Sequence, residues 1–391
     1  MSGESWVVSI PSLPQLSELT TQDPPTAGYR ARPMQPTLAN LVAELEHRLT
    51  GTHEVDRLPP ESAAMIPDGD TYVLALFDGL GAAQMEHRSA EELRSSLCGV
   101  IDAPFPTTTT VSMATVATGS HPRTHGTIGH QMWVPGLGRV VNVLKWRAPT
   151  GEAVDVDTTD WLPAPNLWER LTVRGVEAIT VQPGQFASSP LTQALYRGAR
   201  FEPVYTDSER IEATIQLAAR PGRLVFVYFA EVDFAAHVYG QQSPMYNDAL
   251  ADAARAWSEL SRRLPDGAVL VGTSDHGHVD FSESSKVLIR DARYADLTFY
   301  GDPRALYVRG DRRVIARLAA EVGAELVEPP GIRSMLGPGD DHPELEARLP
   351  DALLLPPPDR LLLPRGMDRR LIGYHGGNTS DERSIPLLVA G

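Results

Sequence analysis

A series of short, continuously apolar runs constrains the fold of this chain more than any other feature of its sequence. Stretches with helical spacing lie between several of these runs. Strands that are apolar on both faces and alternate with helices are typical of a parallel sheet buried under two helical layers. We therefore predict an α/β fold with a mostly parallel central sheet and helices on both faces, in which ligands bind beyond the carboxyl ends of the strands. The predicted strands cover residues 72–77, 176–181, 224–229, 268–272 and 385–390, and the predicted helices cover residues 36–51, 166–174, 208–219 and 244–264.

The alternation of strands and helices fails over residues 131–160 and 281–370, where Pro, Gly and charged residues interrupt the pattern. We interpret both segments as insertions over the active edge of the sheet. The second contains an apolar run at 305–309 and a helical pattern at 311–322, which favours a small α+β cap. The domain prediction is an α/β core at 36–280 and 371–391, a cap at 281–370, and an extended arm over the Ser-, Thr- and Pro-rich residues 1–35.

Charge and cysteine content exclude several classes of partner and site. The chain has 50 Asp and Glu against 35 Lys and Arg, a net charge of -15, which argues against a protein that uses nucleic acid as a scaffold. Cys98 is the sole cysteine, so a metal site has to use His and carboxylate ligands. The sequence shows neither a signal peptide nor an apolar stretch long enough to span a membrane. We expect a soluble, cytoplasmic protein, whose oligomeric state the sequence does not indicate.

Two candidate site residues stand beside glycines near predicted strands. Asp78 follows the strand 72–77 directly, and Gly79 and Gly81 allow a tight turn there. A carboxylate at the carboxyl end of a strand is well placed for a ligand, although Asp-Gly is also an ordinary turn sequence. His375 lies in Tyr-His-Gly-Gly ahead of the last predicted strand, where a structural role and a ligand role are both open.

Four consecutive threonines, residues 107–110, follow Pro106 and precede a helical pattern that reaches Gly119. Hydroxyl and main-chain N–H groups at such a junction can bind an anion or supply a nucleophile. Threonines at a helix start can equally act as N-caps, and the pattern alone does not decide between the two.

Two further motifs place carboxylates next to imidazoles. Asp233 and His237 are four residues apart after the strand 224–229, which puts both side chains on one face of a helical turn, where they can chelate a metal ion. Asp275-His276-Gly277-His278 follows the strand 268–272. Together with one threonine hydroxyl, the motifs supply nitrogen and oxygen ligands that suit two Zn²⁺ ions. The six side chains with such ligands are Asp78, Asp233, His237, Asp275, His276 and His375.

In this order, the motifs resemble the alkaline phosphatase superfamily and, within it, the nucleotide pyrophosphatase/phosphodiesterase branch. The most specific part is Phe105-Pro-Thr-Thr-Thr followed by Ala-Thr-Gly119, Pro122 and His125-Gly126, which is similar to the family's nucleophile segment. The resemblance implies an alkaline phosphatase-like core, two zinc ions, and Thr109 as the covalent nucleophile in the hydrolysis of phosphate diesters or nucleotide pyrophosphates. It further implies that one zinc ion is held by Asp233, His237 and His375, and the other by Asp78, Asp275, His276 and Thr109.

Two positions depart from the family pattern. The family's phosphodiesterases commonly carry Asn three residues after the nucleophile, where this chain has Ser112, whose hydroxyl can still donate one hydrogen bond to a phosphoryl oxygen. The usual Asp-His-Gly-Met reads Asp-His-Gly-His278, and the sequence assigns no role to the added imidazole.

Several alternatives stay open at this point. Among enzymes, the same site could hydrolyse monoesters or phosphonates; the extra negative charge of a monoester needs another cation, and Lys145 in the first insertion either supplies it or is a solvated surface residue. A sulfatase is excluded because Cys98 lacks the required sequence context. Outside enzymes, the alternative is a metal-stabilised binding module, but a closed structural zinc site would not need Thr109 beside it. The expected partner is a small-molecule phosphate ester.

Overall fold

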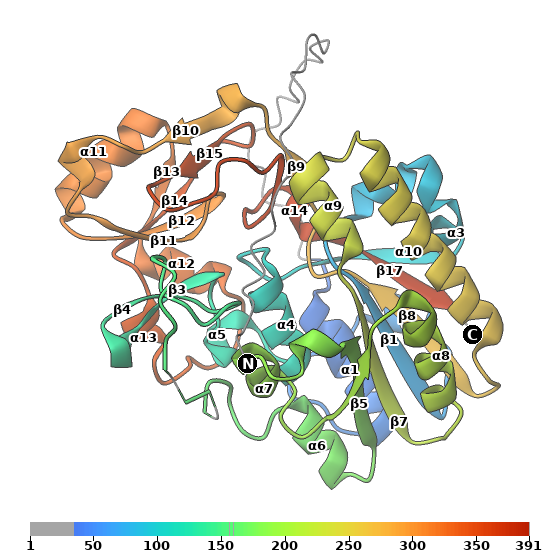
Figure 1. Cartoon of the computed structure of the whole chain (residues 1–391). Coiled ribbons are helices and arrows are strands. Elements are labelled where there is room, and N and C mark those ends of the chain that lie inside the picture. Colours follow the sequence, from blue (N-terminus) through green and yellow to red (C-terminus); the bar gives the residue numbers. More distant parts are fainter. Residues whose placement is uncertain (1–34, 156, 159, 391) are drawn as a thin grey trace, which may run out of the picture. The chain divides into compact units, whose positions relative to one another are not determined.

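The apolar runs of the sequence form a central sheet in the computed structural model, which describes residues 35–155, 157–158 and 160–390 (Figure 1). Within these residues the sheet has seven strands in the order β2-β17-β8-β1-β7-β5-β6. Neighbouring strands pair in parallel from β8 to β6, whereas β17 runs antiparallel to both of its neighbours. The predicted, mostly parallel sheet is therefore confirmed. Its strands are β1 Thr71–Phe77, β2 Leu97–Asp102, β5 Glu177–Pro183, β6 Arg200–Val204, β7 Arg223–Phe229, β8 Ala268–Thr273 and β17 Ser384–Ala390.

Helices cover both faces of the sheet. Successive side chains of its strands point to opposite faces and therefore enter two different cores. On β1, Tyr72 and Leu74 pack in one core, while Val73 and Phe77 pack in the other. Every residue of β1 is buried, which explains why this strand reads as a continuous apolar run. The first core also contains side chains of α1 Leu38–Thr50, α4 Thr109–Thr118, α6 Leu167–Val173 and α7 Pro190–Leu195, and the second those of α8 Asp207–Ala218, α9 Glu231–Tyr239 and α10 Pro244–Arg263.

The sequence did not predict β2 and β6, which are the two edge strands of the sheet. Their side chains are only partly buried, in contrast to those of β1. β6 also contains Pro203, which an edge strand tolerates because one row of its N–H groups has no ladder partner. Exposure and proline remove the apolar continuity by which a strand is recognised.

Residues 281–370 contain a second, antiparallel sheet with the order β11-β12-β14-β13. The apolar run at 305–309 is β12 Ala305–Arg309, and the helical pattern after it is α11 Arg312–Val322. One face of this sheet packs against α11, while Tyr300 and Tyr307 on the other face join the first core of the main sheet. Contacts accordingly group everything from residue 34 onward into one unit, and the cap boundaries at 281 and 370 stay a prediction. The other strands here are β11 Thr298–Asp302, β13 Glu325–Val327 and β14 Ala352–Leu355.

Short elements complete the chain. Residues 131–160 include a hairpin of two antiparallel strands, β3 and β4. Within the described residues, no helix is long and apolar enough to cross a membrane. The domain prediction for residues 1–34 lies outside the described residues. The remaining elements are α2 Pro60–Ala63, α3 Glu91–Arg94, α5 Pro122–His125, β3 Gln131–Val134, β4 Arg139–Asn142, β9 Val279–Asp280, β10 Lys286–Leu288, α12 Pro329–Met335, α13 Leu345–Arg348, β15 Leu361–Leu363, β16 Gly373–Tyr374 and α14 Ser380–Arg383.

A buried ion pair connects the small sheet to the segment before β17. Arg304, in the turn between β11 and β12, donates through Nε to Glu382 Oε1 at 3.0 Å, and the two side chains are 2% and 0% exposed. Burial alone would raise the pKa of Glu382, but the charge of Arg304 and its hydrogen bonds outweigh burial and lower the pKa. Glu382 also accepts the main-chain N–H of Gly377 at 2.9 Å, so the pair holds the backbone just after His375.

We predict that Arg304→Leu lowers the free energy of unfolding by about 3–5 kcal/mol, because it leaves the Glu382 carboxylate buried without its partner. Adding Glu382→Leu should recover part of this loss, since no unpaired charge then remains. Chemical denaturation measures both variants. Arg312→Leu, at an exposed position of α11, is the matched control and should change stability by about 0.5 kcal/mol or less. A loss below about 1 kcal/mol in Arg304→Leu would contradict this account.

Candidate metal centre

The candidate site residues meet at the carboxyl edge of the main sheet because the three central strands end level. Phe77 of β1 pairs with Phe229 of β7, and Leu76 pairs with Thr273 of β8. Asp78, Asp233 and Asp275 each follow one of these strands within a few residues. Gly79 allows the close approach: its φ is +73°, and a Cβ there would lie 2.8 Å from Asp233 Cα. The parallel sheet thus gathers carboxylates that are almost 200 residues apart in the chain.

A two-residue ladder brings His375 to the same edge. β16 pairs antiparallel with β9, with Tyr374 opposite Val279. In this register the next residues are His375 and His278, and their ring centroids lie 5.1 Å apart. The sequence predicted that His375 comes to the site, and this pairing is how it arrives.

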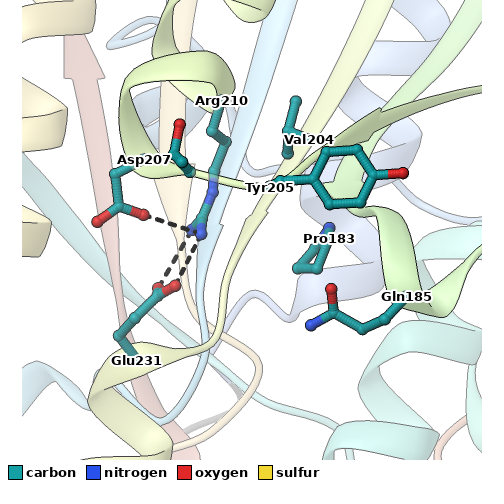
Figure 2. A pocket seen from close by; sticks show the side chains of 8 residues that line it. Pro183, Gln185, Val204, Tyr205, Asp207, Arg210 and Glu231 are labelled. Atoms are coloured by element: carbon teal, nitrogen blue, oxygen red, sulfur yellow. Dashed lines mark hydrogen bonds and ion pairs between the residues drawn. The ribbon is translucent and has the colours of Figure 1, made fainter.

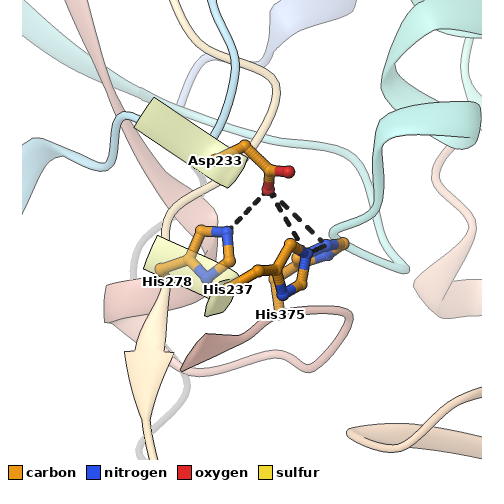
Figure 3. A group of neighbouring side chains, drawn as sticks. All are labelled: Asp233, His237, His278 and His375. Carbon is orange, nitrogen blue, oxygen red and sulfur yellow. Dashed lines mark hydrogen bonds and ion pairs between the residues drawn. The ribbon is translucent and has the colours of Figure 1, made fainter. Parts of the chain in front are cut away.

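Asp233, His237 and His375 form a first group of candidate ligands, with His278 beside them (Figure 3). Asp233 Oδ1 lies 3.5 Å from His237 Nε2 and 3.9 Å from His375 Nε2, and the two Nε2 atoms are 3.2 Å apart. The Nδ1 atoms of the two imidazoles contact main-chain oxygens, His237 with Gly373 at 2.7 Å and His375 with Thr107 at 2.8 Å. A carbonyl only accepts hydrogen bonds, so Nδ1 carries the proton and the Nε2 lone pairs converge on one point, which is the usual arrangement of metal-binding histidines.

A second group surrounds His276. Its Nε2 lies 3.6 Å from Asp78 Oδ1, 3.3 Å from Asp275 Oδ2 and 3.3 Å from the hydroxyl of Thr109. Asp233 also reaches this group, since its carboxylate, that of Asp78 and the His276 ring offer ligand atoms within 4.8 Å of one another. All the predicted metal ligands are therefore brought together, in two adjoining groups.

The carboxylates of the second group fit a metal ion. Asp78 Oδ1 and Asp275 Oδ2 are buried and have no hydrogen-bond partner within the described part of the chain. Burial raises the pKa of Asp78 well above its usual value, and the charges of Asp275 and Asp233 raise it further. Unpaired buried carboxylate oxygens that repel one another are relieved by a cation, and oxygen and nitrogen donors of this kind suit Zn²⁺.

Two of the imidazoles at the site, those of His278 and His375, carry little charge of their own. Burial lowers the pKa of His375 well below its usual value, and the neighbouring imidazoles lower it further. Burial and His237 lower the pKa of His278 to about 4. Burial disfavours ionised Asp233, but the effect of His237 and the hydrogen bond from His278 outweigh it and lower the pKa of Asp233. A neutral His375 beside an ionised Asp233 is in the protonation state that binds a metal ion.

Among the four threonines, Thr109 alone has a side chain that is not buried. The other hydroxyls donate inside the protein, from Thr107 to Gly377 O at 2.9 Å, from Thr108 to Asp302 Oδ1 at 3.5 Å and from Thr110 to Gly129 O at 3.1 Å. Thr109 is the first residue of α4, and Thr108 makes no side-chain cap, so the N-cap interpretation of this segment is not supported. Within the described residues the main-chain N–H groups of Thr109 and Thr110 have no acceptor, which leaves them available to an anion.

Ser112 and Lys145, the two predicted substrate contacts, lie differently. Ser112 is fully buried and donates to the main-chain oxygen of Asp275 at 2.7 Å, so its one proton is already used within the protein. Lys145 is exposed just after β4. Burial lowers the pKa of His130 to about 4, and the charges of Lys145 and His237 add to this effect. Both substrate roles stay predictions.

Sequence reasoning missed Tyr228 and Asp302, and assigned no role to His278. The hydroxyl of Tyr228 donates to Asp78 Oδ2; a polar aromatic side chain near the end of an apolar strand was the available signal. Asp302 arrives from β11 and accepts from Thr108, and burial raises its pKa to about 7. Nothing in the sequence around Asp302 indicates a position beside the threonines.

A hollow of about 320 Å³ opens elsewhere on the same edge of the sheet (Figure 2). Its floor carries Arg210, which pairs with Glu231 at 2.7 Å and with Asp207 at 3.0 Å. The guanidinium is thus already neutralised, and none of the candidate metal ligands lines the hollow.

Residues 72–329 match the family model of type I phosphodiesterase/nucleotide pyrophosphatase. The chain belongs to this family. The matched residues include both carboxylate–imidazole motifs and the threonine segment. Membership identifies the chain as a phosphoester hydrolase of the alkaline phosphatase superfamily, in a family that depends on metal ions, as the sequence motifs predicted.

Solved structures share the fold of this family member. Murine ectonucleotide pyrophosphatase/phosphodiesterase 5 superposes with a TM-score of 0.64 at 17% identity, over 82% of this chain and 88% of that one. Phosphonoacetate hydrolase from Sinorhizobium meliloti, in complex with phosphonoformate, gives 0.61 at 18% identity, over 83% of this chain and 91% of that one. A search of curated protein sequences finds no match. The structural matches confirm the alkaline phosphatase-like core.

We predict that a strong chelator abolishes phosphoester hydrolysis and lowers the melting temperature, because the buried carboxylates then repel one another and the folded state loses its bound ions. Added Zn²⁺ should restore both. Activity on a chromogenic phosphate diester and thermal denaturation measure the effect, and chelator saturated with zinc beforehand is the control. Fewer than one transition-metal ion per chain, in protein that was never exposed to chelator, would contradict the two-metal arrangement.

Proposed function

We propose that this protein hydrolyses phosphate diesters or nucleotide pyrophosphates with two zinc ions, using Thr109 as a covalent nucleophile. The observation that carries the proposal is the hydroxyl of Thr109, which is accessible and lies 3.3 Å from Nε2 of His276, among the candidate ligands. A structural metal site does not need such a hydroxyl. The alternative of a metal-stabilised binding module therefore does not explain why the Thr109 hydroxyl lies among the candidate ligands.

The two groups of side chains correspond to two ions. Asp233, His237 and His375 would hold one, and Asp78, Asp275 and His276 with the Thr109 oxygen would hold the other. Bound zinc would lower the pKa of the Thr109 hydroxyl and stabilise charge on the leaving oxygen. Four positive charges against three carboxylates leave one net positive charge, so the site attracts an anionic substrate despite the acidic surface of the protein.

The reaction has two displacements at phosphorus. Thr109 Oγ1 loses its proton and forms a bond to phosphorus, while the bond to the leaving-group oxygen breaks and that oxygen takes up a proton. The free N–H groups of Thr109 and Thr110 donate to the phosphoryl oxygens. Water then displaces Thr109, which regains its proton, and a phosphate monoester is released. An inactive variant of murine ectonucleotide pyrophosphatase/phosphodiesterase 5, with threonine replaced by alanine, has been solved in complex with AMP, which supports both the nucleophile and a nucleotide product.

Diesters are favoured over monoesters because the described site offers no cation close to the phosphoryl position other than the metals. A monoester carries one more negative charge and needs such a cation. Lys145 is the candidate, because it is an exposed cation in the segment that follows β4. Monoester or phosphonate hydrolysis is therefore the second candidate function, and it depends on this lysine.

We predict that Thr109→Ala keeps its fold and metal content but loses several powers of ten in turnover, because the nucleophile is gone. Stability should change by about 1 kcal/mol or less, since Thr109 is partly exposed and makes no cap. Thr109→Ser should retain measurable activity. Thr110→Ala is the matched control, because the Thr110 hydroxyl only bonds Gly129 O. An active Thr109→Ala together with an inactive Thr108→Ala would contradict this assignment and identify Thr108 as the nucleophile.

We predict that Lys145→Ala lowers kcat/KM for a chromogenic monoester more than for the matching diester, if the ammonium group compensates the extra charge of a monoester. Arg139→Ala is the control, because Arg139 is an exposed cation of the same hairpin that pairs with Glu152. An unchanged monoester-to-diester ratio would assign Lys145 to the solvated surface.

A further inference from the structure

Four side chains surround one candidate zinc position, but they do not use their ring nitrogens in the same way (Figure 3). His237 and His375 present Nε2 to the centre and bind main-chain oxygens through Nδ1. His278 is reversed: its Nε2 lies 2.7 Å from Asp233 Oδ1, and its Nδ1 is buried without a hydrogen-bond partner among the described residues. An ionised carboxylate only accepts, so Nε2 of His278 carries the proton and donates it to Asp233. As a zinc ligand through Nε2, His278 would instead need a proton on Nδ1, which would be a buried donor with no acceptor.

The separations between ligand atoms lead to the same distinction. Atoms bound to a tetrahedral Zn²⁺ at about 2.0–2.1 Å lie roughly 3.3 Å from one another. Asp233 Oδ1, His237 Nε2 and His375 Nε2 are 3.2–3.9 Å apart and match this spacing. The 2.7 Å from His278 Nε2 to Asp233 Oδ1 is too short for two ligands of one zinc ion and is typical of a charge-assisted hydrogen bond.

We propose that His278 is not a zinc ligand but a positioning residue, whose Nε2–H holds the Asp233 carboxylate in place for the zinc ion that Asp233 shares with His237 and His375. This inference rests on the proposed zinc-dependent function. Three protein ligands leave one coordination position open, as in catalytic zinc sites, whereas a fourth imidazole would close the site. The methionine that the family usually carries at this position has no proton to donate. His278 therefore supplies Asp233 with a hydrogen bond that a methionine at the same position could not donate.

The ring of His278 lies close to the main chain of two glycines. Its side chain is fully buried, whereas that of Asp233 is 20% exposed. A Cβ on Gly79 would lie 3.0 Å from His278 Cδ2, and a Cβ on Gly373 would lie 3.0 Å from His278 Nδ1. Gly79 and Gly373 therefore leave room for the ring that a larger residue at either position would take away. Tyr228 holds a carboxylate of the second group as His278 holds Asp233, because the hydroxyl of Tyr228 donates a hydrogen bond to Asp78.

The test compares the zinc affinity of wild type, His278→Met and His278→Gln, measured by competition with a chromophoric chelator. His278→Met should still bind two zinc ions per chain but hold one of them 10–100-fold more weakly, the usual effect of losing such a supporting hydrogen bond. His278→Gln, whose amide can donate to Asp233, should recover most of this affinity. His53→Met, at an exposed position, is the matched control and should bind zinc as wild type does. An affinity of His278→Met within threefold of wild type would overturn the inference and leave His278 as packing alone.

X-ray absorption of the zinc-loaded wild type provides a test that needs no variant to fold. Three imidazoles shared by two zinc ions are expected, and four would make His278 a ligand and overturn the inference. In cobalt-substituted protein, His278→Met should keep the visible spectrum of the wild type in band position, because the ligand set is unchanged. Wild-type protein that binds no zinc would overturn the proposed function itself, which distinguishes that failure from the failure of this inference.

Discussion

The gathering of three carboxylates in one site, two of them buried, is the constraint on which the rest of this structure depends. Asp78 and Asp275 are almost completely buried, and oxygens of both lack hydrogen-bond partners among the described residues. In a low-dielectric environment such an arrangement requires compensating positive charge or bound protons. The raised pKa of Asp78 shows the cost of the arrangement without a cation. His278 and His375 do not supply this charge, because burial lowers the pKa of both imidazoles, and a bound metal ion, on which the family depends, fits the need for positive charge.

The main sheet tolerates this repulsion because its cores hold the carboxylates in place from two sides. β1, β7 and β8 are buried on both faces and end level, and the burial of each large side chain in these strands contributes about 1.5–3 kcal/mol to the stability that opposes the repulsion. The small sheet contributes as well, through Arg304 and Glu382, which hold the backbone after His375. The segment 281–370, which departs from the alternation of strands and helices, therefore supports the same site as the main sheet.

Continuous apolar strands and helical spacing were sufficient to predict the central sheet, its two helical layers, and the edge where the site lies. β2 and β6 escaped prediction because partial exposure and Pro203 break their apolar pattern. The predicted ligands Asp78, Asp233, His237, Asp275 and His276 meet as expected, since each follows the end of a predicted strand. His375 precedes the last predicted strand instead, and the short ladder of β16 and β9 brings it to the same edge. Tyr228, Asp302 and the orientation of His278 could not be predicted, because they depend on contacts between segments whose relative register only the fold defines. Ser112 shows the converse: the family pattern suggested a substrate contact, but tertiary packing directs its hydroxyl to Asp275.

The position of β17 has a consequence for the order in which the molecule can assemble. In the sheet this strand lies between β2 and β8, so residues 97–102 have no sheet neighbour until residues 384–390 arrive. Closing a loop of that length delays the pairing, because its entropy must be overcome before the contacts form. The same segment delivers His375 through the ladder of β16 and β9. During synthesis on the ribosome, the first group of candidate ligands stays one imidazole short until this segment has emerged.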